Sequence, residues 1–570
     1  MLQVTKPTIF VVTIQTRSTP AQTTVLVAGG GPSGLAAAAE LAHQGIDCVV
    51  IEPRPEVAHS RPRAKTTNVR TMEHFRRWRI ADTVRRAAPL AVSWSQRVTF
   101  CASLTGERIL DFDGAFGLTT DRVDHFAEPG QQVPQPMVEQ VLRGHVLSSR
   151  KVDFRVGGSV VGLDDRGAWV DVRVRDAEGV ETVISARYVL GCDGASSVTR
   201  QQIGASYVGT SDPRPNFNVV FSAPELETPL GRAVQYWIVG SAGAGLMGRL
   251  DLSGVWWAIF PGVGPERGAE QASALIEQLV GAKVDHEVLA TDSWTARMLI
   301  SDTFSKGRVY LVGESAHLNP PWGGHGYNTS VGDAVNIAWK IAAVEQGWAS
   351  ADLLDSYEPE RRRVVEQTVA SAASHLGSLA GDLSADARSI EVAKRSEFYS
   401  LGLVLGYSYA GSPAVQPGPM APPLLDLTVY VPSTAPGGRL PHQWLPDGSS
   451  LFDHLGAGMT LLGPLSANAD QVERLVARAA DRGIPLTCLE SPPNYPWRDE
   501  FLLIRPDQHI AWRTTQPDDI DLPLVTGHRS PDAWPASRQD DLTRPSVLQG
   551  TAPVMDVAGP GDRPAASSQT

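Results

Sequence analysis

Three glycines near the start of the chain have the spacing of a phosphate-binding turn. The apolar run Val25–Ala28 predicts a buried strand, and it leads into Gly29, Gly31 and Gly34 with the pattern G-x-G-x-x-G. The first glycine permits a tight turn, the second lets backbone approach a pyrophosphate, and the third lets the next helix pack closely on the strand. Free N–H groups at the start of that helix would hold the phosphates.

An acidic residue completes the pattern. A helix is predicted over Leu35–Gln44 and a second strand over Cys48–Ile51, which ends in Glu52. Glu52 follows Gly29 by 23 residues, close to the separation of about 20 expected for the carboxylate that binds a ribose. Strand, glycine turn, helix, strand and acid in this order predict a βαβ unit that binds a dinucleotide.

Two later segments indicate which dinucleotide is bound. Residues 188–200 predict a strand that runs into Asp193 and a turn of small residues, and residues 307–317 predict a buried strand that ends in Glu314. Residues 318–333 then contain a Pro-Pro pair and several glycines, and a helix is predicted over Ala334–Gln346. Such a loop lets backbone lie against a flat ligand, and the helix directs its positive end at that ligand.

Together these segments resemble the signature motifs of the class A flavoprotein aromatic hydroxylases, over about residues 24–375. The resemblance implies an α/β fold: a Rossmann-like FAD-binding domain of the p-hydroxybenzoate hydroxylase type with an inserted substrate-binding β-sheet. Residues 503–513 resemble the end of the thioredoxin-like C-terminal domain found in the aromatic-polyketide and phenol hydroxylase branch. The family usually has Gly-Asp where this chain has Gly313-Glu314.

The resemblance also implies a set of residues around non-covalently bound FAD. Arg63, in Arg61-Pro-Arg-Ala64, matches the family's Pro-Arg-Ala, and Gln135 matches a position that contacts the flavin side chain. The expected cofactor-binding residues are Gly29, Gly31, Pro32, Ser33, Gly34, Glu52, Arg54, Arg63, Gln135, Asp193, Glu314, Pro321, Gly324, Gly326, Tyr327 and Asn328.

The activity implied by the resemblance is hydroxylation of a phenolic or polycyclic aromatic, polyketide-like substrate. NADPH or NADH would reduce FAD, and O2 would give a flavin C4a-hydroperoxide that attacks the ring. Residues 94–107, 115–118 and 128–135 are similar to hydroxylases of polycyclic aromatic polyketides of the tetracenomycin type. Smaller phenols stay open as substrates.

Few side chains are candidates for direct chemistry. His325 lies between two glycines, and an imidazole with a pKa near neutrality could help to deprotonate a phenol. Tyr236 and Arg249, in the strand-like region 205–298, are candidate substrate contacts, with ordinary sheet packing as the alternative. His317 occupies a motif position that is structural in the family.

Other functions remain to be weighed. A Baeyer–Villiger or epoxidising monooxygenase uses the same fold and cofactor, and a flavin-binding regulatory protein would keep the fold without turnover. A halogenase is disfavoured because its Trp-x-Trp-x-Ile-Pro segment is not matched by Trp256–Pro261.

Composition excludes several partners. The net charge of −12 argues against nucleic acid and anionic membrane surfaces. The four cysteines lack the spacing of a metal site, a disulfide or a Cys-x-x-Cys motif, which suggests a reduced, cytoplasmic protein. We expect a monomer or homodimer. The predicted division is a disordered extension (1–22), the FAD-binding domain (23–204 and 299–379), the substrate-binding sheet (205–298), a helix and linker (380–440), a thioredoxin-like domain (441–527) and a flexible tail (528–570).

Overall fold

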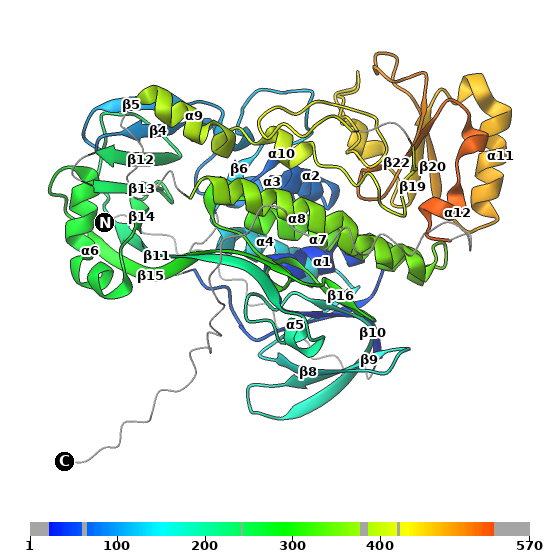
Figure 1. Cartoon of the computed structure of the whole chain (residues 1–570), viewed down its shortest axis with the longest axis horizontal. Helices are drawn as coiled ribbons and strands as arrows, with labels where there is room; N and C mark the ends of the chain where they lie inside the picture. The colour runs from blue at the N-terminus through cyan, green and yellow to red at the C-terminus, as the bar shows by residue number, and fades with distance from the viewer. Residues whose placement is uncertain (1–21, 60–64, 241–242, 377–385, 419–421, 529–570) are drawn as a thin grey trace, which may run out of the picture.

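The structure, a computed structural model, describes residues 22–59, 65–240, 243–376, 386–418 and 422–528. Figure 1 shows three blocks in a row: a sheet with helix α6, a central block of sheet and long helices, and a small domain at the opposite end. The predicted N-terminal extension and C-terminal tail lie outside the described residues except at Gln22 and His528.

The central block is built on a sheet whose middle strands are parallel. The order is β16-β17-β10-β1-β2-β7, and β9 and then β8 continue the sheet beside β10 in antiparallel pairing. The apolar residues of β1 are completely buried, as expected for a parallel strand covered on both faces. The strands are β1 (Gln22–Ala28), β2 (Cys48–Glu52), β7 (Val152–Val156), β8 (Ser159–Asp165), β9 (Val170–Arg175), β10 (Glu181–Gly191), β16 (Ser305–Lys306) and β17 (Val309–Leu311).

Helices cover this sheet, and α1 packs against α7. The helix predicted over Ala334–Gln346 begins earlier, at Gly326, where the hydroxyls of Thr329 and Ser330 donate to the carbonyls of His325 and Gly326. The helices of this block are α1 (Pro32–His43), α2 (Val69–Arg77), α3 (Ala81–Ala87), α4 (Gln135–Ser148), α5 (Val198–Gln202), α7 (Gly326–Glu345) and α8 (Tyr357–Ser374). A short ladder joins β3 (Thr66–Thr67) to β6 (Gln131–Gln132).

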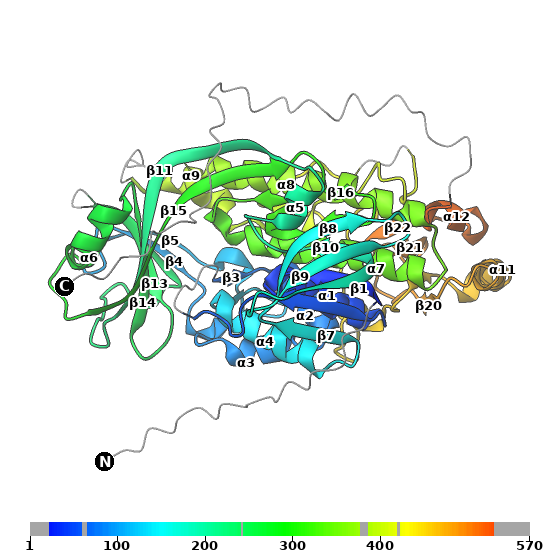
Figure 2. The ribbon, with the colours of Figure 1, turned by 90° about the horizontal axis from the view of Figure 1, so that it is seen from below.

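The outer sheet has the order β18-β15-β11-β14-β13-β12-β4-β5. Its long strands β11 and β15 run from the central block into this sheet, as Figure 2 shows. Residues 98–112, which the predicted division assigned to the FAD-binding domain, form β4 and β5, and β4 pairs in parallel with β12. The strands are β4 (Val98–Cys101), β5 (Arg108–Phe112), β11 (Tyr207–Ser222), β12 (Gln235–Gly240), β13 (Gly243–Arg249), β14 (Val255–Pro261), β15 (Glu287–Ser301) and β18 (His317–Leu318).

The two faces of the outer sheet pack against different helices. Phe217 and Phe221 alternate toward α6 (Pro265–Val280), where Leu275 completes an apolar core. Trp237 lies on the opposite face and packs edge-on against Phe398 at the end of α9 (Ala387–Phe398), with ring centroids 5.8 Å apart. The segment predicted as helix and linker thus contains α9 and then α10 (Leu401–Leu405).

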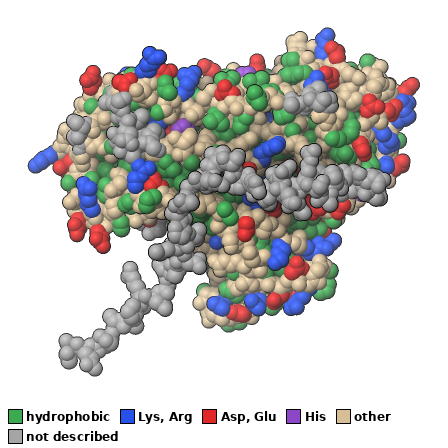
Figure 3. Space-filling model, in the orientation of Figure 1, with side chains coloured by type: hydrophobic (Ala, Val, Ile, Leu, Met, Phe, Trp, Pro, Cys, Tyr) green, Lys and Arg blue, Asp and Glu red, His purple; other side chains and the backbone are tan. Residues whose placement is uncertain are grey.

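The C-terminal domain is a small mixed sheet with helices. Its strand order is β20-β19-β21-β22, with α11 crossing between the parallel pair β19 and β20. Among the described residues, no helix combines the length and hydropathy needed to cross a membrane. On the face seen in Figure 3, acidic and basic side chains are interspersed. The elements are β19 (Met459–Gly463), α11 (Ala469–Ala480), β20 (Leu486–Glu490), β21 (Phe501–Ile504), β22 (Ile510–Thr514) and α12 (Leu522–Val525).

Candidate flavin and substrate site

The glycine turn after β1 combines close packing with an open surface. A Cβ on Gly29, whose φ is +103°, would lie 2.4 Å from the carbonyl oxygen of Cys192, and a Cβ on Gly34 would lie 1.9 Å from the carbonyl oxygen of Gly29. Both positions therefore exclude a side chain. A Cβ on Gly31 would meet only Nη2 of Arg54, at 4.0 Å. The space beside Gly31 is open to a pyrophosphate.

The start of α1 faces the same turn. Pro32 is the first helical residue and has no N–H to leave unpaired, and Leu35 donates the first hydrogen bond of the helix to the Gly31 carbonyl. The N–H groups of Ser33 and Gly34 precede that bond, so they remain available to an anion, and the helix dipole adds partial positive charge.

Glu52 is buried at the end of β2, with one oxygen turned toward the glycine turn. Its Oε2 accepts a hydrogen bond from the Gly30 N–H at 2.7 Å. Its Oε1 accepts from the backbone N–H of Arg54 at 3.0 Å and from Arg54 Nε at 2.6 Å. A carboxylate offers about four acceptor positions, so one stays available to a ribose hydroxyl. Arg54 also donates to Glu139 at 3.1 Å.

Three further predicted residues have different surroundings. Asp193 accepts hydrogen bonds from Ser197 Oγ at 2.5 Å and from the Thr199 N–H at 2.8 Å, so its carboxylate shapes the turn before α5. Gln135 is the first residue of α4 and is half-buried. Glu314 has an exposed side chain. These positions keep their assignment to the cofactor as predictions.

We call residues 320–328 the Pro-Gly loop. Gly323 and Gly324 have φ values of +71° and +68°, which favour glycine. Asn328 fixes the end of the loop: its Oδ1 accepts from the Asn68 N–H at 3.0 Å, and its Nδ2 donates to the carbonyls of Thr66 at 2.9 Å and Gly324 at 2.6 Å.

Other residues of the loop contact β3 and begin α7. The hydroxyl of Tyr327 lies 2.8 Å from Thr67 Oγ1. Gly326 is the first residue of α7, so the positive end of a long helix begins inside the loop. Pro321 is exposed at the surface.

His325 lies inside the protein, with 3% of its surface exposed. Burial, together with the nearby His375, lowers its pKa to about 4, so the imidazole is neutral at neutral pH. It lines two small cavities, of about 30 and 10 Å³, that it shares with Asn68 and Val404. It is absent from the lining of the larger cavity described next.

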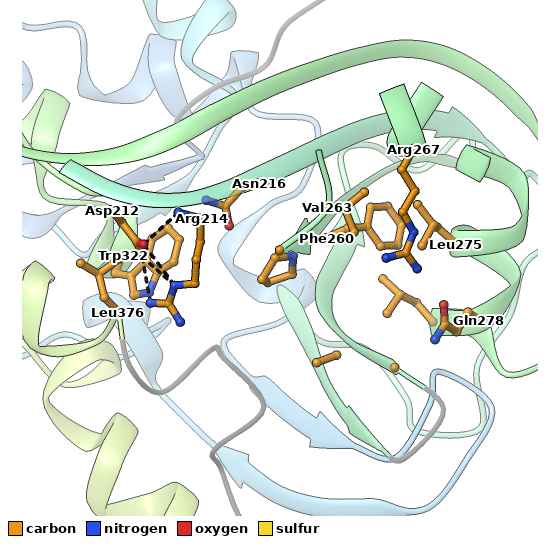
Figure 4. A pocket seen from close by; sticks show the side chains of 15 residues that line it. Asp212, Arg214, Asn216, Phe260, Val263, Arg267, Leu275, Gln278, Trp322 and Leu376 are labelled. Atoms are coloured by element: carbon orange, nitrogen blue, oxygen red, sulfur yellow. Dashed lines mark hydrogen bonds and ion pairs between the residues drawn. The ribbon is translucent and has the colours of Figure 1, made fainter. Parts of the chain in front are cut away.

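A cavity of about 390 Å³ lies between the Pro-Gly loop and the outer sheet (Figure 4). Trp322 and Leu376 lie on one side of it, and Phe260 and Leu275 lie on the other. Its lining residues are Asp212, Arg214, Asn216, Gly243, Ala244, Phe260, Pro261, Gly262, Val263, Arg267, Leu275, Gln278, Leu279, Trp322 and Leu376.

The two predicted substrate contacts, Tyr236 and Arg249, do not line this cavity. The Tyr236 ring packs near Trp256 in the core under α6, and its hydroxyl accepts from the Ala233 N–H at 3.0 Å; burial raises the pKa of this tyrosine to about 12. The Arg249 guanidinium stacks over Trp256 at 4.7 Å and donates to the Leu226 carbonyl. Their surroundings favour packing over substrate contact.

Two residues with site-like surroundings had no role in the sequence interpretation. Trp322, in the Pro-Gly loop, lines the large cavity, and an aromatic residue directly after the Pro-Pro pair is the sequence signal for it. Lys65 donates from Nζ to the backbone carbonyls of Val234 and Arg249, at 3.0 and 2.8 Å, and burial lowers its pKa to about 7. No local pattern marks Lys65, because its partners lie far along the chain.

The described residues fit FAD. The open space at Gly31, the free N–H groups of α1 and the available oxygen of Glu52 accommodate the pyrophosphate and the ribose. Arg63 lies outside the described residues, so its contact stays a prediction. Within the described ranges, no group of three or more His, Cys, Asp or Glu residues could hold a metal ion.

Known proteins share both parts of this architecture. Residues 22–372 match the FAD binding domain family, and residues 433–526 match the family described as aromatic-ring hydroxylase, C-terminal. Aklavinone 12-hydroxylase RdmE of Streptomyces purpurascens is 30% identical, over 86% of this chain and 95% of its own length. The FAD-dependent monooxygenase apdD of Emericella nidulans is 28% identical, over 86% of this chain and 87% of its own.

Solved structures agree with these relatives. The rebeccamycin biosynthetic enzyme RebC with reduced flavin superimposes with a TM-score of 0.80 at 29% identity, over 90% of this chain and 100% of that chain. The predicted fold, FAD cofactor and monooxygenase class are thereby confirmed. This chain belongs to the family of FAD-dependent aromatic-ring hydroxylases with a C-terminal domain.

Proposed function

We propose that this protein uses NAD(P)H and O2 to hydroxylate a phenolic or polycyclic aromatic, polyketide-like substrate bound in the 390 Å³ cavity. The observation that supports this most directly is the position of the cavity, because Trp322 of the Pro-Gly loop lines it. Relatives named for both substrate classes, aklavinone 12-hydroxylase and phenol 2-monooxygenase, support the same range.

The cavity suits a flat aromatic molecule. Its volume lies within the range of about 300–1,000 Å³ typical of small-molecule sites. Trp322 is held on two sides: its Nε1 donates to the His375 carbonyl at 3.1 Å, and its ring packs edge-on against Trp294 at 5.5 Å. Asn218 in turn accepts from Trp294 Nε1 at 2.8 Å. A wall fixed in this way can orient an aromatic ring and exclude water.

The chain's own groups would hold the cofactor and orient the ring. The N-terminus of α1 and Glu52 would bind the pyrophosphate and ribose, and Asn328 would fix the Pro-Gly loop. The N-terminus of α7 would stabilise negative charge beside that loop. Bound FAD would supply the redox chemistry, taking electrons from NAD(P)H and activating O2. His325 belongs to this loop but does not line the cavity, and its lowered pKa keeps the imidazole neutral at neutral pH.

The decisive experiment measures NADPH and NADH oxidation with a panel of phenols and polyketide quinones, and records product masses under ¹⁸O2. Hydroxylation predicts substrate-stimulated oxidation and one labelled oxygen atom on the ring. A product labelled only from water would contradict the proposal. Ring expansion or an epoxide would assign the protein to the Baeyer–Villiger or epoxidising alternative. A flavin-binding regulatory protein would show no substrate-stimulated oxidation.

We further propose a cytoplasmic location and a monomeric or homodimeric state. The scattered cysteines support the reducing compartment: Cys48, Cys101 and Cys192 are buried, and Cys488 is partly buried. Light scattering of the purified holoenzyme would determine the oligomeric state.

A further inference from the structure

The turn between β21 and β22, residues 505–509, is buried between the C-terminal domain and the central block. Hairpin turns normally lie in solvent, where water satisfies their backbone. Here Arg505, Asp507, Gln508 and His509 are each exposed by no more than 2%. Arg505 forms two hydrogen bonds with Glu360 of α8, at 2.7 and 2.8 Å.

Gln508 has an unusual backbone conformation in this turn. Its φ is +66°, the left-handed region, which this position of a three-residue hairpin loop usually gives to glycine. A residue with a Cβ is strained there. The Gln508 side chain accepts a hydrogen bond through Oε1 from Arg70 Nη1 at 2.5 Å, and Arg70 Nη2 donates to the Asp507 carbonyl at 2.6 Å. The glutamine thus supplies a contact that glycine could not.

Arg70 connects this turn to the Pro-Gly loop through α2. Arg70 lies in the first turn of α2, two residues after the capping residue Asn68. The Asn68 N–H donates to Asn328 Oδ1 at 3.0 Å, and Asn328 Nδ2 donates to the Gly324 carbonyl at 2.6 Å. Hydrogen bonds, together with the backbone of residues 68–70, therefore connect Gln508 to Gly324. Arg70, His325 and Asn328 also line one cavity of about 30 Å³.

A second route leads from the turn at residues 505–509 through α8 to Asp333 of α7. Asp333 of α7 accepts from the Gly313 N–H at 3.2 Å, from His317 Nε2 at 2.7 Å and from Arg361 Nε at 2.7 Å. Arg361 Nη1 donates to the Tyr409 hydroxyl at 2.9 Å. The Tyr409 ring lies 4.3 Å from that of His509, centroid to centroid.

We propose that residues 505–509 of the C-terminal domain position the Pro-Gly loop for FAD, with Gln508 and Arg70 as positioning residues. This inference rests on the role of that loop in binding FAD. If the apoprotein's loop samples several conformations, its apparent FAD affinity falls in proportion to the fraction in the binding conformation. A C-terminal domain without paired cysteines would in this way contribute to the flavin site without touching it.

The test compares FAD binding to the apoprotein, by flavin fluorescence, in Gln508→Gly and Gln508→Glu. Glycine relieves the backbone strain but removes the Arg70 acceptor, so we expect a dissociation constant raised roughly three- to tenfold. Glutamate has the same length as glutamine and can pair with Arg70, so Gln508→Glu should retain the wild-type affinity for FAD. The ratio of hydrogen peroxide to hydroxylated product should rise in Gln508→Gly at saturating FAD, since a loosely held loop excludes water less well.

Arg79→Gly is the matched control. Arg79 has a φ of +60° and is exposed, so glycine relieves the same kind of strain away from the loop. It should leave FAD affinity and peroxide release unchanged. Should Gln508→Gly behave like Arg79→Gly, the turn has no positioning role, and a lowered melting temperature alone would identify it as a stability element. If even the wild-type apoprotein does not bind FAD, the FAD assignment itself fails.

Discussion

The glycine turn at residues 29–34 and the Pro-Gly loop at residues 320–328 both present backbone to the cofactor region, but they are held differently. Gly29 and Gly34 hold the first turn by close backbone packing, because without side chains they fit against the carbonyls of Cys192 and Gly29. The Pro-Gly loop depends on Asn328, which bonds to Asn68 and Thr66. Those partners lie more than 250 residues away in sequence.

This difference predicts how substitutions in the two regions affect FAD binding and protein stability. In the first turn, Gly31 faces open space, whereas Gly29 and Gly34 are closely packed. Single substitutions there can therefore affect FAD binding or protein stability independently. In the Pro-Gly loop, the residues that fix the backbone also connect to distant elements, so a substitution changes both. The following substitutions test that contrast.

The largest effect is expected at Gly31. Gly31→Val places a side chain in the space for the pyrophosphate, so FAD affinity should fall by at least about 100-fold, roughly 2.7 kcal/mol. The apoprotein should melt within about 2 °C of wild type, because a Cβ at this position meets only Arg54 Nη2, at 4.0 Å. Fluorescence titration and a thermal melt measure the two quantities.

Gly34→Ala is the comparison for this variant. Its Cβ would lie 1.9 Å from the Gly29 carbonyl oxygen, so the apoprotein itself should lose about 3 kcal/mol of stability. If Gly31→Val kept its flavin, the turn would not hold the cofactor.

Glu52→Ala should weaken FAD binding about ten- to a hundredfold, because a hydrogen bond to a charged group contributes roughly 1.5–3 kcal/mol. Part of the loss will come from the Gly30 N–H, which donates to Glu52 at 2.7 Å. Glu52→Gln keeps an acceptor oxygen and should lose less. Equal affinities for the alanine variant and wild type would exclude the ribose contact.

The sequence predicted the glycine turn at residues 29–34 well, but it did not predict contacts that depend on the assembled sheets. A glycine spacing, an apolar strand and an acid are local, so the β1–α1–β2 unit follows from them directly. The side-chain surroundings of Tyr236 and Trp237 were beyond such patterns, since neighbouring residues of a strand face opposite sides and only the assembled sheet shows which side meets α6. The contact of Gln508 with Arg70 joins residues 438 positions apart, and no local pattern encodes it.

Asn328→Ala should lower both stability and FAD affinity in one step. The change leaves the Asn68 N–H and the carbonyls of Thr66 and Gly324 without this partner, at a cost of about 2–3 kcal/mol. FAD affinity should fall about tenfold. Asn468→Ala, in the C-terminal domain, removes one weaker bond at 3.3 Å and should leave FAD affinity unchanged. A loss of affinity without a loss of stability would contradict the contrast drawn above.

The smallest effect is expected at His325, and it appears mainly at acidic pH. Burial lowers the His325 pKa from 6.5 to about 4, so the unfolded chain binds one more proton than the folded chain between these values. The free energy of unfolding therefore falls as the pH falls through this window. His325→Gln removes this pH-dependent contribution. Between pH 7 and pH 5, the free energy of unfolding of the variant should therefore fall by about 2 kcal/mol less than that of the wild type.

His442→Gln is the matched control, because burial also lowers the His442 pKa to about 4 and this residue lies in the C-terminal part of the chain, bonded to Ser450. Both variants should show the flatter pH dependence of stability. His325→Gln should match His442→Gln in turnover at every pH, because His325 does not line the 390 Å³ cavity and an imidazole with a pKa of about 4 is a weak base for a phenol. A turnover that is lower in His325→Gln alone, most at the acidic end of the pH–rate profile, would show that His325 accepts the phenol proton.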